Sequence, residues 1–139
     1  MKTITSYLLG FIVSVIILTI LFRFFLSYSL ANKEITVQVL SCVVYFIGMF
    51  SSGWYFGKKD GNYLPIYDVG FRFHLSTYLV FNLTSELWYI FEFNSSYEKI
   101  KYIHLTAISW GIFVLIHFFY YLWSRKQTID NLDKSDLFE

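Results

Sequence analysis

A stripe of hydrogen-bonding side chains lies along one face of an otherwise apolar segment, residues 73–91. Positions four apart share one face of a helix, and that spacing joins His74, Tyr78, Asn82 and Glu86. If the segment crosses a membrane, such side chains face protein rather than lipid. The stripe therefore predicts a polar intramembrane network between this helix and a neighbouring one.

A second histidine matches His74 in depth. At about 1.5 Å per residue, an antiparallel hairpin of residues 73–91 and 102–123 places His74 and His117 within about one turn of each other. Two facing imidazoles could ligate a haem iron axially, or bind another ligand such as a quinone. Alternatively, each histidine hydrogen-bonds across the helix pair, with Tyr78, Asn82 or Tyr121 as partner. No carboxylate or thiol joins them at this depth, so no metal site is predicted.

Glu86 is the acid that lies well inside a predicted span, and it comes shortly before the turn that His104 follows. His104 is on the opposite side of its helix from His117. An intramembrane carboxylate is a functional hypothesis by default, here proton transfer or cation binding together with His104. The alternative is that Glu86 simply reaches interfacial water at the end of the span.

The composition identifies the class of protein that must position these residues. The chain has 139 residues, of which 56% are hydrophobic and 15% charged, whereas soluble domains carry about 25% charged residues. A net charge of +1 leaves no basic surface for nucleic acid. One cysteine, Cys42, excludes an internal disulfide. The absence of a phosphate loop, a nucleophile elbow or a His-Glu-x-x-His motif predicts no catalytic residues and no enzyme.

The hydropathy pattern predicts a single membrane domain over residues 1–139, all-α, with four transmembrane helices in an antiparallel bundle. A span needs about 20 mostly apolar residues, and it must be helical to satisfy its backbone in lipid. The predicted spans are residues 7–26, 36–56, 73–91 and 102–123, followed by a polar cytoplasmic tail over 124–139.

The distribution of basic residues predicts that both termini are cytoplasmic. The side with the termini carries seven Lys and Arg residues and the other side four, and the richer side stays inside. Arg23, near the far end of the first span, is expected to extend to the interface. The alternative is that the first span is a signal peptide cleaved near Ser29-Leu30-Ala31, which would leave three spans and an outside N-terminus.

The second half of the chain, about residues 67–139, resembles the bacterial 2TM domain family. That family has an aromatic-x-x-His-Leu-x-x-Tyr-x-x-x-Asn stretch, which here reads FRFHLSTYLVFN over residues 71–82. Its second helix carries Gly-Trp-Gly-Ile-Gly-Leu and then a histidine, which here reads SWGIFVLIH over residues 109–117. Ser109 and Phe113 depart from the family's glycines, and the first two spans match nothing. The resemblance implies a signalling or regulatory module of a bacterial inner membrane.

These observations predict a small non-enzymatic inner-membrane protein, a regulatory or accessory subunit of a membrane or signalling complex. Its expected partners are the lipid bilayer and either a protein partner or further copies in a homo-oligomer, and not nucleic acid. One alternative is a haem-binding redox or sensor subunit that uses His74 and His117. Another is a pore-type effector that oligomerises through the small-residue step from Gly48 to Ser52.

Overall fold

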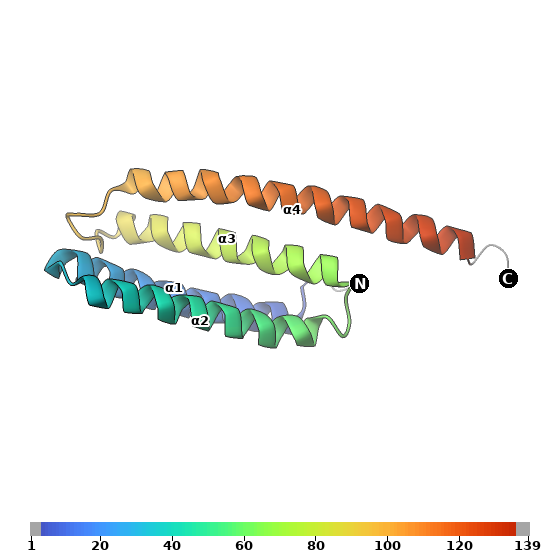
Figure 1. Cartoon of the computed structure of the whole chain (residues 1–139), viewed down its shortest axis with the longest axis horizontal. Coiled ribbons are helices and arrows are strands. Elements are labelled where there is room, and N and C mark those ends of the chain that lie inside the picture. The colour runs from blue at the N-terminus through green and yellow to red at the C-terminus, as the bar shows by residue number, and fades with distance from the viewer. Residues whose placement is uncertain (1–3, 136–139) are drawn as a thin grey trace.

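The protein folds into four α-helices, which confirms the predicted all-α class. The computed structural model describes the backbone of residues 4–135 and the side chains of residues 4–128. The helices are α1 (Ser6–Asn32), α2 (Ile35–Asp60), α3 (Ile66–Ile90) and α4 (Ile100–Ser135). Short turns make each helix antiparallel to the next (Figure 1).

Each helix is longer than the apolar stretch that predicted it, because capping groups lie outside the apolar run. The Thr5 side chain accepts a hydrogen bond from the Leu8 backbone N–H at 3.1 Å and begins α1. Lys33 ends α1 in the left-handed conformation, with φ of 59°. The expected tail is helical as far as Ser135, because polar residues continue a helix that is already nucleated. The remainder of the expected tail, residues 136–139, lies outside the described residues.

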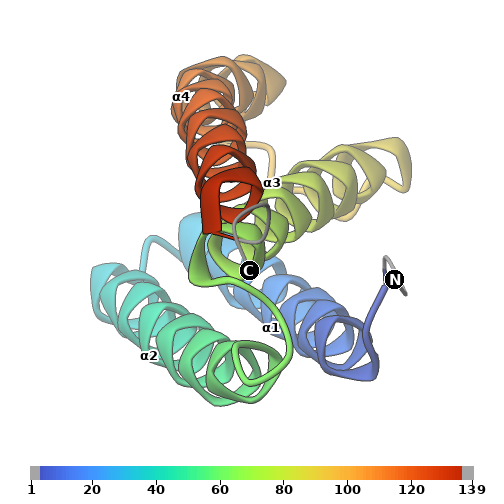
Figure 2. The ribbon, with the colours of Figure 1, turned by 90° about the vertical axis from the view of Figure 1, so that its right-hand side faces the viewer.

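The bundle is open rather than closed. In the part of the chain that the structure describes, α1, α2 and α3 pack against one another, whereas α4 packs against α3 alone. The end-on view shows α4 at the edge of the molecule above α3, away from the pair α1 and α2 (Figure 2). A hairpin of α3 and α4 is thus attached to the rest of the chain through α3.

The core lies between α1 and α3. Leu8, Phe11 and Val15 of α1 are buried against Val69 and Phe73 of α3. The rings of Phe11 and Phe73 stack with their centroids 4.4 Å apart. This contact fixes the helix that carries the polar stripe against the first helix of the chain.

Glycine allows α1 and α2 to approach closely. A Cβ atom at Gly48 would lie 2.8 Å from Leu18 Cδ2, and one at Gly10 would lie 2.7 Å from Phe56 Cε1. The small-residue step at Gly48 therefore packs within one chain. The pore hypothesis places this face between chains. In the structure, the side chain of Leu18 from the same chain fills the space beside Gly48.

Most of the large apolar side chains lie on the outside of the fold. The accessible surface is 9902 Å², compared with about 7600 Å² for a compact soluble protein of this mass. Three helical stretches are long and apolar enough to cross a membrane: Ser6–Asn32, Ile35–Asp60 and Ile100–Thr128. α3 is not among these three, although it was predicted as a span, because it carries the polar stripe.

Candidate functional site

His74 of α3 and His117 of α4 meet inside the α3–α4 hairpin, at the matching depth that the sequence predicted. The two Nδ1 atoms are 3.0 Å apart and share a hydrogen bond. The indole Nε1–H of Trp110 donates to His74 Nε2 at 2.8 Å. The expected partners, Tyr78, Asn82 and Tyr121, make none of the described hydrogen bonds to either imidazole. The histidines bond to each other and to Trp110 instead.

The three side chains form a directed chain of hydrogen bonds. An indole N–H can only donate, so His74 Nε2 must accept, and a neutral His74 therefore carries its proton on Nδ1. That proton is donated to His117 Nδ1, which leaves the His117 proton on Nε2. Here the Nε2 atom faces Gly70, where an added Cβ would lie 3.7 Å away. Each ring nitrogen of His74 is thus in use, and the arrangement holds α3 against α4.

This arrangement does not fit a haem between the two histidines. A bond from a metal to an imidazole nitrogen is about 2 Å long, so two axial nitrogens lie about 4 Å apart across the iron. The facing nitrogens of His74 and His117 are 3.0 Å apart, with no space for a porphyrin plane. Among the side chains of residues 4–128, no three His, Cys, Asp or Glu residues converge to hold a metal ion.

The middle of the polar stripe joins the helices through Tyr78 but not through Asn82. The Tyr78 hydroxyl donates to the backbone carbonyl of Ala107 on α4 at 3.2 Å. Asn82 Nδ2 donates instead to the carbonyl of Tyr78, one turn back in its own helix, at 2.7 Å. The expectation that Asn82 bonds across the helix pair is therefore wrong, because an own-helix carbonyl lies within its reach.

Glu86 and His104 meet at the end of the hairpin near the α3–α4 turn. Glu86 Oε1 and His104 Nε2 are 3.0 Å apart, and their side chains are 37% and 55% exposed respectively. The contact predicted between these two residues is present. Unlike the His74–His117 pair, the Glu86–His104 pair lies on the outer surface of the hairpin. No other described residue covers it.

A buried ion pair that the sequence analysis missed lies at the same end of the molecule. Arg23 of α1 donates from Nη2 to Glu98 Oε2 in the α3–α4 turn at 2.8 Å, and both side chains are about 95% buried. Ser27 donates to the other carboxylate oxygen, and Trp88 Nε1–H donates to Ser27 at 3.0 Å. The α3–α4 turn folds over Arg23 and supplies the carboxylate that it binds. Its expected extension to the membrane interface stays a prediction.

Asp60 is a second buried acid that the sequence did not single out. It ends α2 and is fully buried, and neither carboxylate oxygen has a hydrogen-bond partner among the described residues. Its backbone carbonyl accepts from the N–H groups of Tyr63 and Leu64 and closes the turn to α3. Asp60 thus stabilises the α2–α3 turn through its backbone carbonyl.

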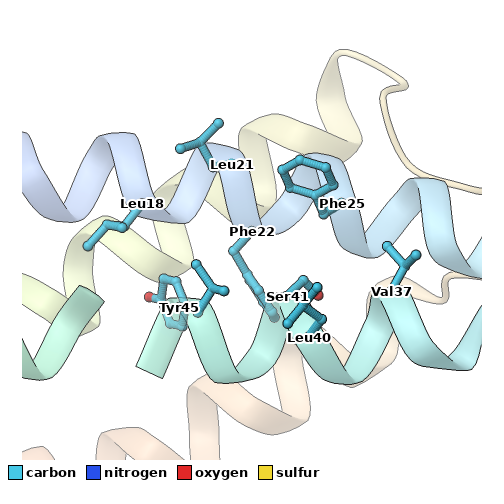
Figure 3. Close-up of a pocket in the computed structure, with 9 residues that line it drawn as sticks. Leu18, Leu21, Phe22, Phe25, Val37, Leu40, Ser41 and Tyr45 are labelled. Carbon is cyan, nitrogen blue, oxygen red and sulfur yellow. The ribbon is translucent and has the colours of Figure 1, made fainter. Parts of the chain in front are cut away.

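A groove of about 350 Å³ lies between α1 and α2. It is lined by apolar side chains such as Leu18, Phe22 and Leu40, together with Ser41 and Tyr45 (Figure 3). The Tyr45 hydroxyl is 3.3 Å from Thr19 Oγ1 and is used within the fold. The groove therefore offers an apolar surface without charged groups, and it holds none of the predicted site residues.

Comparisons of this chain with protein-family models, with curated proteins and with solved structures gave no match. The resemblance to the 2TM domain family stays a prediction that depends on the motifs in α3 and α4.

Proposed function

We propose that this chain is a four-span protein of a bacterial cytoplasmic membrane with both termini inside. We propose further that it is a non-enzymatic accessory or regulatory subunit that binds another protein within the membrane. Three apolar helices and the large exposed apolar surface support insertion. The excess of Lys and Arg beside the termini supports the orientation.

Two features support the proposal that α3 crosses the membrane: its length, and the direction of its polar side chains toward α4. Its 25 residues extend about 37 Å, compared with a hydrocarbon thickness of about 30 Å. His74 and Tyr78 bond to α4, so their polar atoms are not offered to lipid. Pairing with α4 thus lowers the cost of placing this less apolar helix in the bilayer.

The observation that carries the accessory role is the outward Glu86–His104 pair. Both residues lie four positions from a helix end, at Ile90 and Ile100, and both are partly exposed on the outside of the hairpin. Polar side chains in spans normally face protein. The hydrogen bonds of His74, His117 and Trp110, in contrast, lie inside the hairpin and join α3 to α4. A protein surface over Glu86 and His104 accounts for the outward pair.

Photo-crosslinking in intact cells tests this proposal. A benzophenone amino acid replaces Leu83, which is exposed one turn from Glu86, or Phe46, which is exposed on α2. We expect a discrete protein adduct from position 83, lost when Glu86 and His104 are both changed to leucine, and none from position 46. Lipid adducts alone at both positions would refute the partner, and recovery of the chain in the soluble fraction would refute the membrane assignment.

A further inference from the structure

One flank of the α3–α4 hairpin combines the outward Glu86–His104 contact with a shallow groove. On α4, His104, Ile108, Gly111 and Leu115 recur at helical spacing and share this flank. The groove has a volume of about 500 Å³, and Tyr78 of α3 lines it together with residues of α4 that include Ala107, Ile108, Gly111 and Leu115. The Glu86–His104 contact lies one turn further along α4, toward the α3–α4 turn.

Small residues make this flank suitable for close approach by a helix. Ala107 and Gly111 form a small-x-x-x-small step in the groove, and such steps let helix backbones come together in membranes. Gly111 is limited on its inner side, where an added Cβ would lie 3.2 Å from the Tyr78 hydroxyl. Tyr78 of α3 contacts both residues of the step, whereas neither α1 nor α2 packs on α4 in the described residues. The side of the step that faces away from Tyr78 is therefore left without a helix from this chain.

The flank carries both an acid and a base, so two copies of it can match each other. Because Glu86 and His104 bond to each other, an acid and a base lie at one depth in the membrane. A two-fold axis along the membrane normal keeps every depth unchanged and makes an isologous interface. When that axis passes between the Glu86 and His104 side chains, it places Glu86 of each copy opposite His104 of the other. An unrelated helix needs its own matched charges at this depth, and lipid tails have none.

We propose that this flank, defined by Ala107, Ile108, Gly111 and the Glu86–His104 pair, is the interface of a parallel homodimer. The partner in the proposed function is then a second copy of this chain, and the inference rests on that function. In the dimer the two α4 helices cross at the Ala107–Gly111 step. The two acids and two bases of the two copies alternate at one end of the crossing.

Cysteine crosslinking tests the interface with a matched control. The single native cysteine, Cys42, is exposed on α2 and is first changed to alanine. Ile108→Cys then places a thiol in the groove, whereas Ser109→Cys places one at almost the same depth in a different groove, beside Thr106 and Phe113. Oxidation in native membranes should link most of the Ile108→Cys protein into dimers and leave Ser109→Cys monomeric. Equal crosslinking of the two variants would overturn the proposal.

Charge variants test the two-fold pairing separately from folding. The exchange Glu86→His with His104→Glu keeps an acid and a base at one depth, so it should retain the dimer. Changing both residues to leucine removes both polar groups and should lower the Ile108→Cys dimer fraction several-fold, while the His74–His117 bond still holds the hairpin together. Retention of the full dimer in the leucine variant would overturn the charge argument.

The position-83 crosslink separates failure of the dimer from failure of the proposed function. An adduct of position 83 with a different protein, and no Ile108→Cys dimer, would overturn the homodimer and keep the accessory role. A chain that is in the membrane but gives neither product would overturn both.

Discussion

At the residue scale, one buried ion pair joins the α3–α4 turn to α1. Arg23 and Glu98 are paired at 2.8 Å with little exposure, and Ser27 and the Ser95 backbone N–H also donate to the carboxylate. The first helix and the α3–α4 turn are thereby joined at one carboxylate. Because removal of one partner leaves the other charge buried, such a pair is far more sensitive to a single change than a surface pair.

The change Glu98→Gln is therefore expected to destabilise the protein by about 3–5 kcal/mol, since Arg23 keeps its charge without a counter-charge. Unfolding of the purified protein in mixed micelles by titration with sodium dodecyl sulfate measures the loss. Glu92→Gln in the same turn is the matched control, because Glu92 is exposed and surface changes usually stay within about 0.5 kcal/mol. Similar losses for the two variants would show that the ion pair is not what stabilises this turn.

The residues that sequence reasoning located correctly are those whose positions depend only on helical geometry. The meeting of His74 with His117 follows from the rise per residue and the position of the turn. Glu98 could not be found in this way, because it lies in an irregular turn without periodicity. The lone charge of Arg23 in an apolar span was a usable signal, since such a charge needs an acid at the same end of the molecule.

At the scale of helices, the molecule consists of two hairpins, and different interactions hold the two helices of each hairpin together. The hairpin of α1 and α2 is held by close packing at glycine, whereas that of α3 and α4 is held by the hydrogen bonds of Tyr78, His74 and Trp110. The number of helices and their order could be read from hydropathy. Their lengths could not, because caps such as Thr5 and the polar continuation of α4 are invisible to an apolar pattern.

Gly48→Leu is expected to separate α1 from α2 and to destabilise the fold by about 1–3 kcal/mol, the usual cost of overpacking. An added Cβ at this position lies 2.8 Å from Leu18 Cδ2. Leu18→Ala in the same chain should restore part of the loss by clearing that space. Gly53→Ala is the control, because its nearest contact is at 3.9 Å and alanine favours a helix. An equal loss for both glycine variants in the detergent titration would contradict this packing.

At the scale of the whole molecule, the helices form an open arrangement rather than a closed bundle. α1, α2 and α3 pack against one another, whereas α4 stands at one edge and packs on α3 alone (Figure 2). An apolar pattern predicts that each helix needs an apolar environment but not which neighbours supply it. This is why four helices could be expected from the sequence while the isolated position of α4 could not.

We expect two of the tryptophans, one on α2 and one on α4, to face lipid. Trp54 of α2 and Trp123 of α4 are 68% and 58% exposed, whereas Trp110 is half-buried and donates to His74. In variants that keep one tryptophan each, we expect brominated lipids to quench Trp54 and Trp123 more strongly than Trp110. Iodide, which stays in water, should quench Trp110 least of the three, since its indole faces α3. Strong quenching of Trp110 by brominated lipid would mean that α4 is turned about its axis and that the histidine chain is not inside the hairpin.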